Sequence, residues 1–279
     1  ESTHVALITG MPGVGKTWLA AYLAHQNSVP ERTFWHRCLP DEGLQALIWA
    51  FAGFMATQNK VGLWQILHAR RPNELPPYHV LLGYLFQELS GQNFLLCLDD
   101  VHHLIDDPGY ERFVERTRQA VENDEFRLII TAQQAVEFTS YLSSPLTGLT
   151  VNEAQQLLAR QSVQLDEPLL SQLYERTEGN AYLLNLAAQA LQGTNDPDGL
   201  IYGLVNNSEI KKYLHKHVDK QLSSNERLVM QGVAALLEWP GTADEIEEVL
   251  GGQNARRTLI YLSNRYLLEE KQAENGIAY

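Results

Sequence analysis

Residues 10–17 have the sequence Gly-Met-Pro-Gly-Val-Gly-Lys-Thr, in which two glycines separated by four residues are followed by Lys-Thr. An apolar segment typical of a short strand, residues 4–9, precedes this octet, and residues 18–24 read as a helix after it. Strand, glycine-rich turn and helix in this order are the setting in which the pattern forms a phosphate-binding loop. The octet therefore restricts the first part of the chain to a fold built on a β-loop-α unit.

The residue types in this loop suit a ligand with several adjacent negative charges. Backbone N–H groups and the positive end of the following helix attract phosphate, and the glycines let the backbone come close. Lys16 is expected to reach the β- and γ-phosphates, and Thr17 to hold Mg²⁺. We therefore expect ADP or ATP with Mg²⁺ as the ligand. The expected nucleotide contacts in this region are Met11, Pro12, Gly13, Val14, Gly15, Lys16, Thr17 and Trp18.

A second candidate motif follows a continuous apolar run at residues 94–98, as expected of a central parallel strand. The run ends in Asp99 and Asp100, and doubly wound sheets bind ligands at the carboxyl ends of such strands. Alone, this pair would be interpreted as a solvated strand end. After a phosphate-binding loop it indicates a Walker B motif. We expect Asp99 to bind Mg²⁺ through water and Asp100 to orient or deprotonate an attacking water.

Composition narrows the class of protein. With 279 residues, 44% of them hydrophobic, the chain is long enough for two or three globular domains. We expect neither a membrane span nor a signal peptide, and the two cysteines, Cys38 and Cys97, predict buried thiols in a reduced, cytoplasmic protein. The formal net charge of −13 argues against nucleic acid as a partner.

The first part of the chain alternates strand and helix signals, which predicts a parallel α/β sheet. The candidates after the loop helix are residues 33–38, 42–57, 78–89, 110–121 and 126–131. From about Thr147 only helix signals remain, starting with a capping box at Thr150 and Glu153. We predict a P-loop nucleotide-binding α/β domain over residues 1–146 and a small helical lid domain over residues 147–203.

The third predicted unit begins after residues 196–199. Capping boxes at Ser223 and Thr242 start two helices, and an apolar stripe marks a third. Residues 266–270 and 277–279 flank an Asn-Gly pair, which is a hairpin turn signal. Three helices and a hairpin predict a winged-helix domain over residues 204–279. Its nearly neutral charge, nine Lys and Arg against eleven Asp and Glu, does not favour a DNA-binding surface.

The order of these three domains resembles the nucleotide-binding oligomerisation module of the STAND ATPases, in particular the NB-ARC or apoptosome-type branch, in a prokaryotic-like form. The Walker motifs are shared by many NTPases, but two further segments are more specific. Residues 149–158 are similar to the family's link between sheet and lid, and residues 179–184 resemble its Gly-x-Pro lid motif.

The resemblance implies further contacts and two departures from the family pattern. Ala181 stands where the lid proline would touch adenine, next to Tyr182, and Gln133 lies in the segment where an arginine would sense the γ-phosphate. A neutral amide cannot supply the charge-assisted contact of arginine, which implies weak sensing or hydrolysis. The resemblance also implies that the chain is the core of a longer protein with sensor repeats and an effector domain.

The resemblance implies a signal-transduction switch. ADP would hold the module closed, ATP would favour opening and self-association, and slow hydrolysis using Asp100 and Lys16 would reset it. Two alternatives remain. One is a DNA-binding P-loop ATPase with a winged helix, either origin-recognition-like or a transcription regulator. The other is a nucleotide-locked scaffold that does not hydrolyse ATP.

Overall fold

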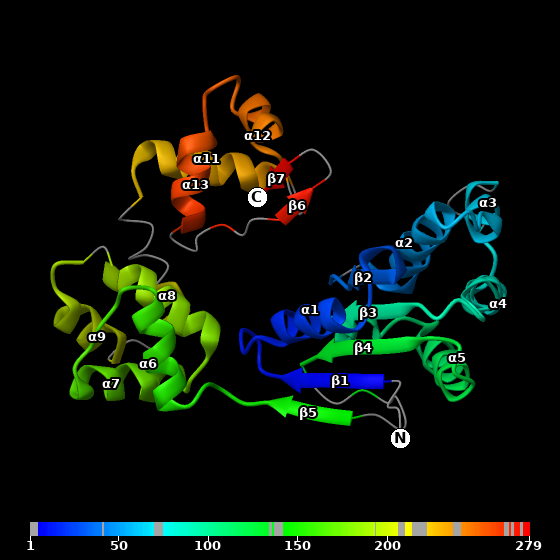
Figure 1. The fold of residues 1–279 in the computed structure, drawn as a ribbon, viewed down its shortest axis with the longest axis horizontal. Helices are drawn as coiled ribbons and strands as arrows, with labels where there is room; N and C mark the ends of the chain where they lie inside the picture. The colour runs from blue at the N-terminus through cyan, green and yellow to red at the C-terminus, as the bar shows by residue number, and fades with distance from the viewer. Residues whose placement is uncertain are drawn as a thin grey trace. The chain divides into compact units, whose positions relative to one another are not determined.

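The computed structural model divides into two units, Glu1–Thr147 and Gly148–Tyr279 (Figure 1). The residues that it describes are 5–40, 42–69, 75–133, 136, 142–192, 194–205, 210–213, 222–236, 241–264, 268, 271–273 and 276–279.

The first unit is built on a five-stranded sheet of order β2-β3-β4-β1-β5, in which all neighbouring strands are parallel. Its strands are β1 (Val5–Gly10), β2 (Thr33–Arg37), β3 (Leu95–Asp99), β4 (Arg127–Ala132) and β5 (Leu142–Leu146). Since the strands are parallel, the carboxyl ends of β1, β3 and β4 meet at the same edge of the sheet. This confirms the predicted parallel α/β fold.

Helices cover both faces of this sheet. They are α1 (Lys16–Asn27), α2 (Gly43–Thr57), α3 (Gly62–His68), α4 (Tyr78–Leu89) and α5 (Tyr110–Glu122), with short 3-10 turns η1 (Pro30–Arg32) and η3 (Val101–Leu104). On one face, Ala20 and Ala24 of α1 pack against Ile8 and Ile129 of the sheet. On the other face, α2, α4 and α5 enclose the larger apolar core. The loop between β1 and α1 is thus held at both ends by elements that pack against each other.

The structure adds two elements that the sequence did not predict, β5 and α3. The β5 segment reads Leu-Ser-Ser-Pro-Leu, and serine and proline are poor indicators of a strand. Pro145 is tolerated because β5 lies at the edge of the sheet, where one side needs no ladder hydrogen bond. The predicted strands and helices of this unit otherwise occur within one or two residues of their expected bounds, except that α1 ends three residues later than expected.

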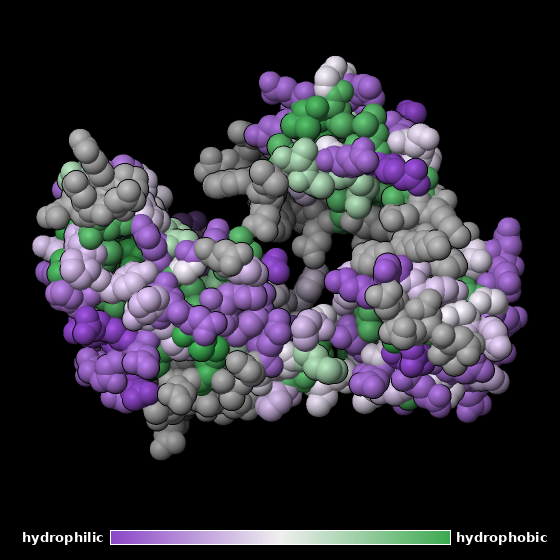
Figure 2. Space-filling view, turned by 180° about the vertical axis from the view of Figure 1, so that it is seen from behind, coloured by the Kyte–Doolittle hydropathy of each residue, from purple (hydrophilic) through white to green (hydrophobic). Residues whose placement is uncertain are grey.

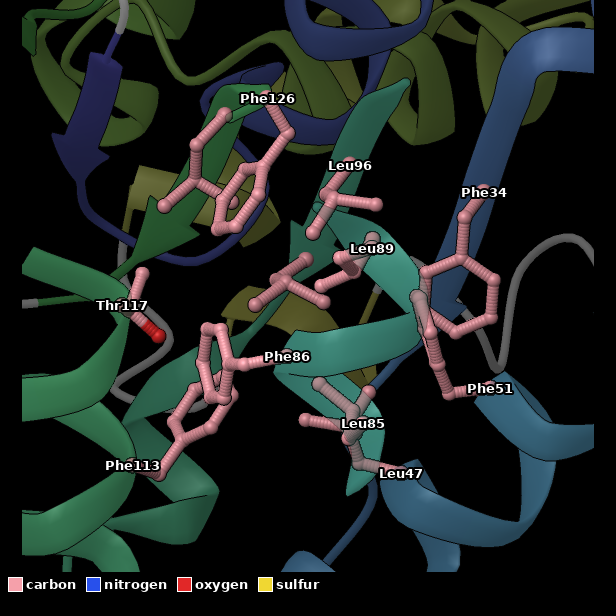
Figure 3. A pocket seen from close by; sticks show the side chains of 12 residues that line it. Phe34, Leu47, Phe51, Leu85, Phe86, Leu89, Leu96, Phe113, Thr117 and Phe126 are labelled. Atoms are coloured by element: carbon pink, nitrogen blue, oxygen red, sulfur yellow. The ribbon is translucent and has the colours of Figure 1, made fainter. Parts of the chain in front are cut away.

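A small cavity lies between the sheet and α2, α4 and α5 (Figure 3). Its walls are aliphatic and aromatic side chains, with Thr117 of α5 as the polar exception. The Thr117 hydroxyl is buried and has no hydrogen-bond partner among the described residues. An unsatisfied hydroxyl in an apolar environment costs about 1–3 kcal/mol, and a water needs more than one polar partner to be held there. Thr117 is therefore a weak point in the core.

We expect Thr117→Val to raise the free energy of unfolding by about 1 kcal/mol, because the isosteric methyl removes the unpaired hydroxyl. The measurement is urea denaturation followed by circular dichroism. Thr177→Val is the matched control: Thr177 is equally buried in α7 (Glu167–Thr177), but its hydroxyl donates to the Leu173 carbonyl at 2.9 Å. That control should lose stability. A loss of stability in both variants would contradict the conclusion that the Thr117 hydroxyl is unpaired and destabilising.

The second unit begins with four helices around one apolar cluster. They are α6 (Val151–Arg160), α7, α8 (Ala181–Gln192) and α9 (Pro197–Val205). The predicted capping box at the start of α6 is present. The predicted boundary between residues 203 and 204 falls inside α9, whose Leu200, Ile201 and Leu204 are buried in this cluster. The third unit was expected to begin after residues 196–199, but Pro197 is the first residue of α9, a position that proline favours.

A separate cluster joins α11 (Ser224–Ala235), α12 (Ala243–Val249) and α13 (Arg256–Asn264). The predicted capping boxes at Ser223 and Thr242 are both present. The terminal hairpin pairs β6 (Lys271–Ala273) with β7 (Gly276–Ala278), so its first strand lies later than predicted, and Asn275 of its turn is outside the described residues. Three helices and a hairpin form the expected winged helix.

No helix in the described part of the chain is long and apolar enough to cross a membrane.

Candidate nucleotide-binding site

The loop between β1 and α1 has the backbone that its glycines allow. Gly10 has a φ of 150°, and a Cβ there would lie 2.7 Å from the Leu146 carbonyl oxygen of β5. Gly15 has a φ of 108°, and no described atom lies within 4 Å of the place where its Cβ would be. Gly10 is therefore required because a side chain there would collide with β5. Gly15 is favoured by its positive φ, and not by a lack of space for a side chain.

Lys16 is the first residue of α1 and is buried at its base. Its Nζ donates to the carbonyl oxygens of Gly10 at 3.0 Å and Met11 at 3.1 Å. Burial lowers the pKa of Lys16, while the nearby Asp100 and Asp99 carboxylates act to raise it. Among the described residues no side chain caps the amino end of α1. The ammonium group and the first N–H groups of the helix together form a place for an anion.

Asp99 ends β3, and its carboxylate is almost fully buried. The Thr17 hydroxyl lies 3.0 Å from both of its oxygens, and the Thr131 hydroxyl at the end of β4 donates to Oδ1 at 2.5 Å. Two hydroxyls from different elements therefore hold this buried charge and join the phosphate loop to the Walker B strand. Hydrogen bonds to a charged group are worth about 1.5–3 kcal/mol each.

Asp100 follows immediately and has a left-handed backbone, with a φ of 57°. Its N–H donates to the Thr131 hydroxyl at 2.8 Å. Its Oδ2 lies 3.5 Å from Nε of Arg37, which ends β2, and its Oδ1 lies 3.8 Å from Nδ1 of His102. A left-handed conformation at a residue other than glycine costs about 1 kcal/mol or more and often marks a functional site.

The donor atoms fit magnesium. Thr17 and Asp99 offer a hydroxyl and a carboxylate, the hard oxygen ligands that Mg²⁺ takes together with phosphate oxygens and water. Lys16 bonds to loop carbonyls, which it can exchange for phosphate oxygens. These residues would hold the ion and the β- and γ-phosphates, and the ion would supply neutralisation of charge on the phosphates.

The other predicted contacts fall into two groups. Met11, Pro12, Gly13 and Trp18 are exposed around the loop, Trp18 with 75% of its surface accessible, and Val14 is buried beneath it. Gln133, one residue past β4, is exposed, and no described contact joins it to the carboxylates. Ala181 and Tyr182 begin α8 in the second unit. The nucleotide contacts of all of these residues stay predictions.

Sequence reasoning missed Thr131 and Arg37, which the structure places beside the two carboxylates. Thr131 was visible as the last residue of a predicted strand, and Arg37 as the next-to-last residue of another. Their involvement depends on strand order: β4 lies between β1 and β3, and Arg37 pairs in register with Asp99. No local pattern in the sequence states that order.

Both cysteines are free and buried, as predicted. Burial raises the pKa of Cys38 to about 12 and that of Cys97 to about 12, and the neighbouring Asp99 carboxylate adds to both shifts. A thiol with such a pKa is not ionised near neutral pH and is a poor nucleophile. The chemistry of the site therefore depends on its carboxylates, hydroxyls and lysine.

The fold and this site define a P-loop ATPase. The AAA domain family matches residues 1–142, just over half of the chain, and the chain belongs to that family. Nucleotide binding, typically with Mg²⁺, is what such a domain implies. No curated protein matches the chain.

Solved structures share the fold along the whole chain. A STAND protein with a tetratricopeptide repeat sensor from Pyrococcus horikoshii has a TM-score of 0.64 and 18% identity over 100% of this chain, which spans 38% of that protein. The Orc1 protein of Aeropyrum pernix, solved in complex with DNA, has a TM-score of 0.51 and 14% identity over 100% of this chain and 82% of its own. A Walker-type ATPase of Pyrococcus abyssi has a TM-score of 0.50 and 14% identity over 99% of this chain and 88% of its own.

We expect Thr131→Val to weaken magnesium-dependent binding of ATP by about tenfold, in the range seen when groups that orient metal ligands are removed. The substitution leaves one bond fewer to the buried Asp99 carboxylate and removes the acceptor for the Asp100 N–H. Isothermal titration with and without Mg²⁺ measures this effect. Thr131→Ser keeps the hydroxyl and should retain most of the affinity; equal losses in the two variants would show that the hydroxyl is not responsible.

Proposed function

We propose that this chain is a nucleotide-operated signal-transduction switch of the STAND class, similar to the NB-ARC or apoptosome-type module. The observation that carries the proposal is the junction of Lys16, Thr17 and Asp99 at the edge of the sheet, with Thr17 and Asp99 in direct contact. The likeness to the Pyrococcus horikoshii STAND protein extends beyond this site to all of the chain, including the helical body and the winged helix.

The nucleotide would act by differential affinity for two arrangements of the domains. A ligand present at a thousand times its dissociation constant stabilises the state that it binds by about 4 kcal/mol. ADP would favour a closed arrangement with contacts to Ala181 and Tyr182, and ATP an open one that self-associates. Equal affinity for the two states would shift nothing. Sensor repeats and an effector domain of a longer chain would supply input and output.

Hydrolysis would reset the switch slowly. The Asp100 carboxylate acts electrostatically on Lys16, raising its pKa. Asp100 would orient or deprotonate the attacking water, and Lys16 would balance charge on the phosphates. Gln133 lies where the family resemblance would place a γ-phosphate arginine, and a neutral amide stabilises developing charge less well. The carboxylate and lysine together with the neutral Gln133 support slow ATP hydrolysis that resets a switch, and not the fast turnover of a metabolic enzyme.

We expect Lys16→Ala to lower the affinity for ADP and ATP at least about a hundredfold, because a charge-assisted phosphate contact buried in the loop is lost. Isothermal titration measures the affinities, and nucleotide released from the purified protein by heating is identified by chromatography. Circular dichroism checks that the variant is folded. A variant that binds nucleotide as tightly as the unaltered protein would remove the basis of the proposed switch.

The second candidate function is a DNA-binding ATPase, favoured by the likeness to the Orc1 protein that was solved with DNA. This likeness leaves nucleic acid open as a partner, despite the net charge. On α13, the helix of the winged helix that would enter a groove, one of the two described arginines, Arg256, is paired with a carboxylate. Arg256 pairs with Asp244, and the N–H groups of Ala255 and Arg256 bond to Glu247 at 2.8 and 3.3 Å.

Exposed apolar side chains on the winged helix support the switch over this alternative. Val249, Ile260 and Ile277 have 46%, 52% and 47% of their surface accessible, and Figure 2 shows hydrophobic surface on this body. A DNA-facing surface is polar and positively charged. Apolar groups on a winged helix whose Arg256 is already paired with a carboxylate are better suited to contacts between proteins.

We therefore expect the chain to cause no salt-dependent mobility shift of duplex DNA. The variant Asp244→Asn with Glu247→Gln removes two negative charges at α13 while keeping side chains that can accept hydrogen bonds. DNA binding by the unaltered chain that weakens with salt and strengthens in this variant would establish the second function.

A further inference from the structure

His102 lies in η3, three residues after Asp99, and its side chain is only 12% exposed. Neither ring nitrogen has a hydrogen-bond partner among the residues that the structure describes. Leaving a buried polar group unsatisfied costs about 1–3 kcal/mol. A phenylalanine or leucine would fill this position without that cost, so packing alone does not account for a histidine here.

The surroundings of the ring point to its partner. The carboxylate of Asp100 lies close to the ring, with Oδ1 3.8 Å from Nδ1. The ring of His103 packs against that of His102, with ring centroids 4.1 Å apart. The left-handed backbone of Asp100 and its bond to Thr131 hold the base of this turn. A movement of less than about 1 Å would bring Nδ1 and Oδ1 to hydrogen-bond distance, and catalytic hydrogen bonds are often long before substrate is bound.

The ring suits the role of a neutral donor. Burial lowers the pKa of His102, the charges of His103 and Lys16 lower it further, and Asp100 and Asp99 act to raise it. A neutral imidazole has one N–H to donate. Arg37 approaches the other oxygen, Oδ2, from β2 with a side chain that is 64% exposed. One oxygen of Asp100 thus faces the buried ring of His102, and the other faces the exposed guanidinium of Arg37.

We propose that His102 is a positioning residue for hydrolysis, which donates from Nδ1 to Oδ1 of Asp100 and leaves the other carboxylate oxygen to receive the attacking water. This inference rests on the proposed hydrolytic function. It assigns to His102 no contact with the nucleotide. Its loss should therefore lower kcat and leave KM and nucleotide affinity unchanged.

The experiment compares steady-state ATP hydrolysis by the unaltered protein, His102→Phe, His103→Phe and Asp100→Asn. We expect His102→Phe to lower kcat by about tenfold or more, within the range of effects of mispositioned acid–base groups, with an unchanged or higher urea midpoint. The matched control His103→Phe keeps the ring stack and should hydrolyse ATP at the rate of the unaltered protein.

A conservative variant separates hydrogen bonding from shape. The amide nitrogen of His102→Asn lies near the place of Nδ1 and should restore part of the lost kcat, whereas His102→Gln puts its donor near Nε2 and should not. Two outcomes would overturn the role of His102. In the first, the unaltered protein hydrolyses ATP and His102→Phe leaves kcat unchanged. In the second, His102→Asn and His102→Phe lower kcat equally. Equal background rates in the unaltered protein and Asp100→Asn overturn the proposed hydrolysis itself.

Discussion

The buried carboxylate of Asp99 is the interaction on which the rest of this site depends. A charge withdrawn from water is tolerated only when hydrogen bonds replace its hydration, and here Thr17 and Thr131 supply them. Because Thr17 lies in the first turn of α1 and Thr131 near the end of β4, the hydrogen bonds to this one carboxylate join the phosphate loop to β3 and β4. Oxygens of this kind are the ligands that Mg²⁺ requires. The carboxylate oxygens that accept these hydrogen bonds are therefore the same atoms that would bind the metal.

The order of the strands in the sheet decides which side chains meet at the site. Placing β4 between β1 and β3 puts a hydroxyl between the loop and the Walker B acids, and placing β2 beside β3 brings an arginine to the outer side of Asp100. Asp100 consequently differs from Asp99 although they are neighbours in sequence. Asp99 is buried and tied to two hydroxyls, whereas Asp100 stands on a strained turn between Arg37 and His102. Such a difference in surroundings would allow two adjacent carboxylates to take the separate roles proposed for them, one as a metal ligand and the other toward water.

The second unit presents a different kind of constraint. Leu149, just past the start of this unit, donates its N–H to the Gly179 carbonyl at 2.8 Å and accepts from the Tyr174 hydroxyl at 2.9 Å. A Cβ on Gly148 or Gly179 would come within 2.1 Å of backbone oxygens. The connection from the sheet is thus bound to the turn that begins α8, the helix whose first residues are proposed to touch the nucleotide. A switch of the proposed kind needs such a link between ligand contact and domain connection.

The sequence by itself determined the elements whose causes are local. The glycine-lysine loop, the apolar strand before Asp99 and the three capping boxes each follow from residues a few positions apart, and all were found where predicted. The edge strand β5, the continuation of the helical body into α9 and the placement of Thr131 and Arg37 beside the two carboxylates were decided only by the tertiary structure. Each depends on which strands lie side by side and which surfaces bury one another, and those long-range choices leave no short-range pattern in the chain.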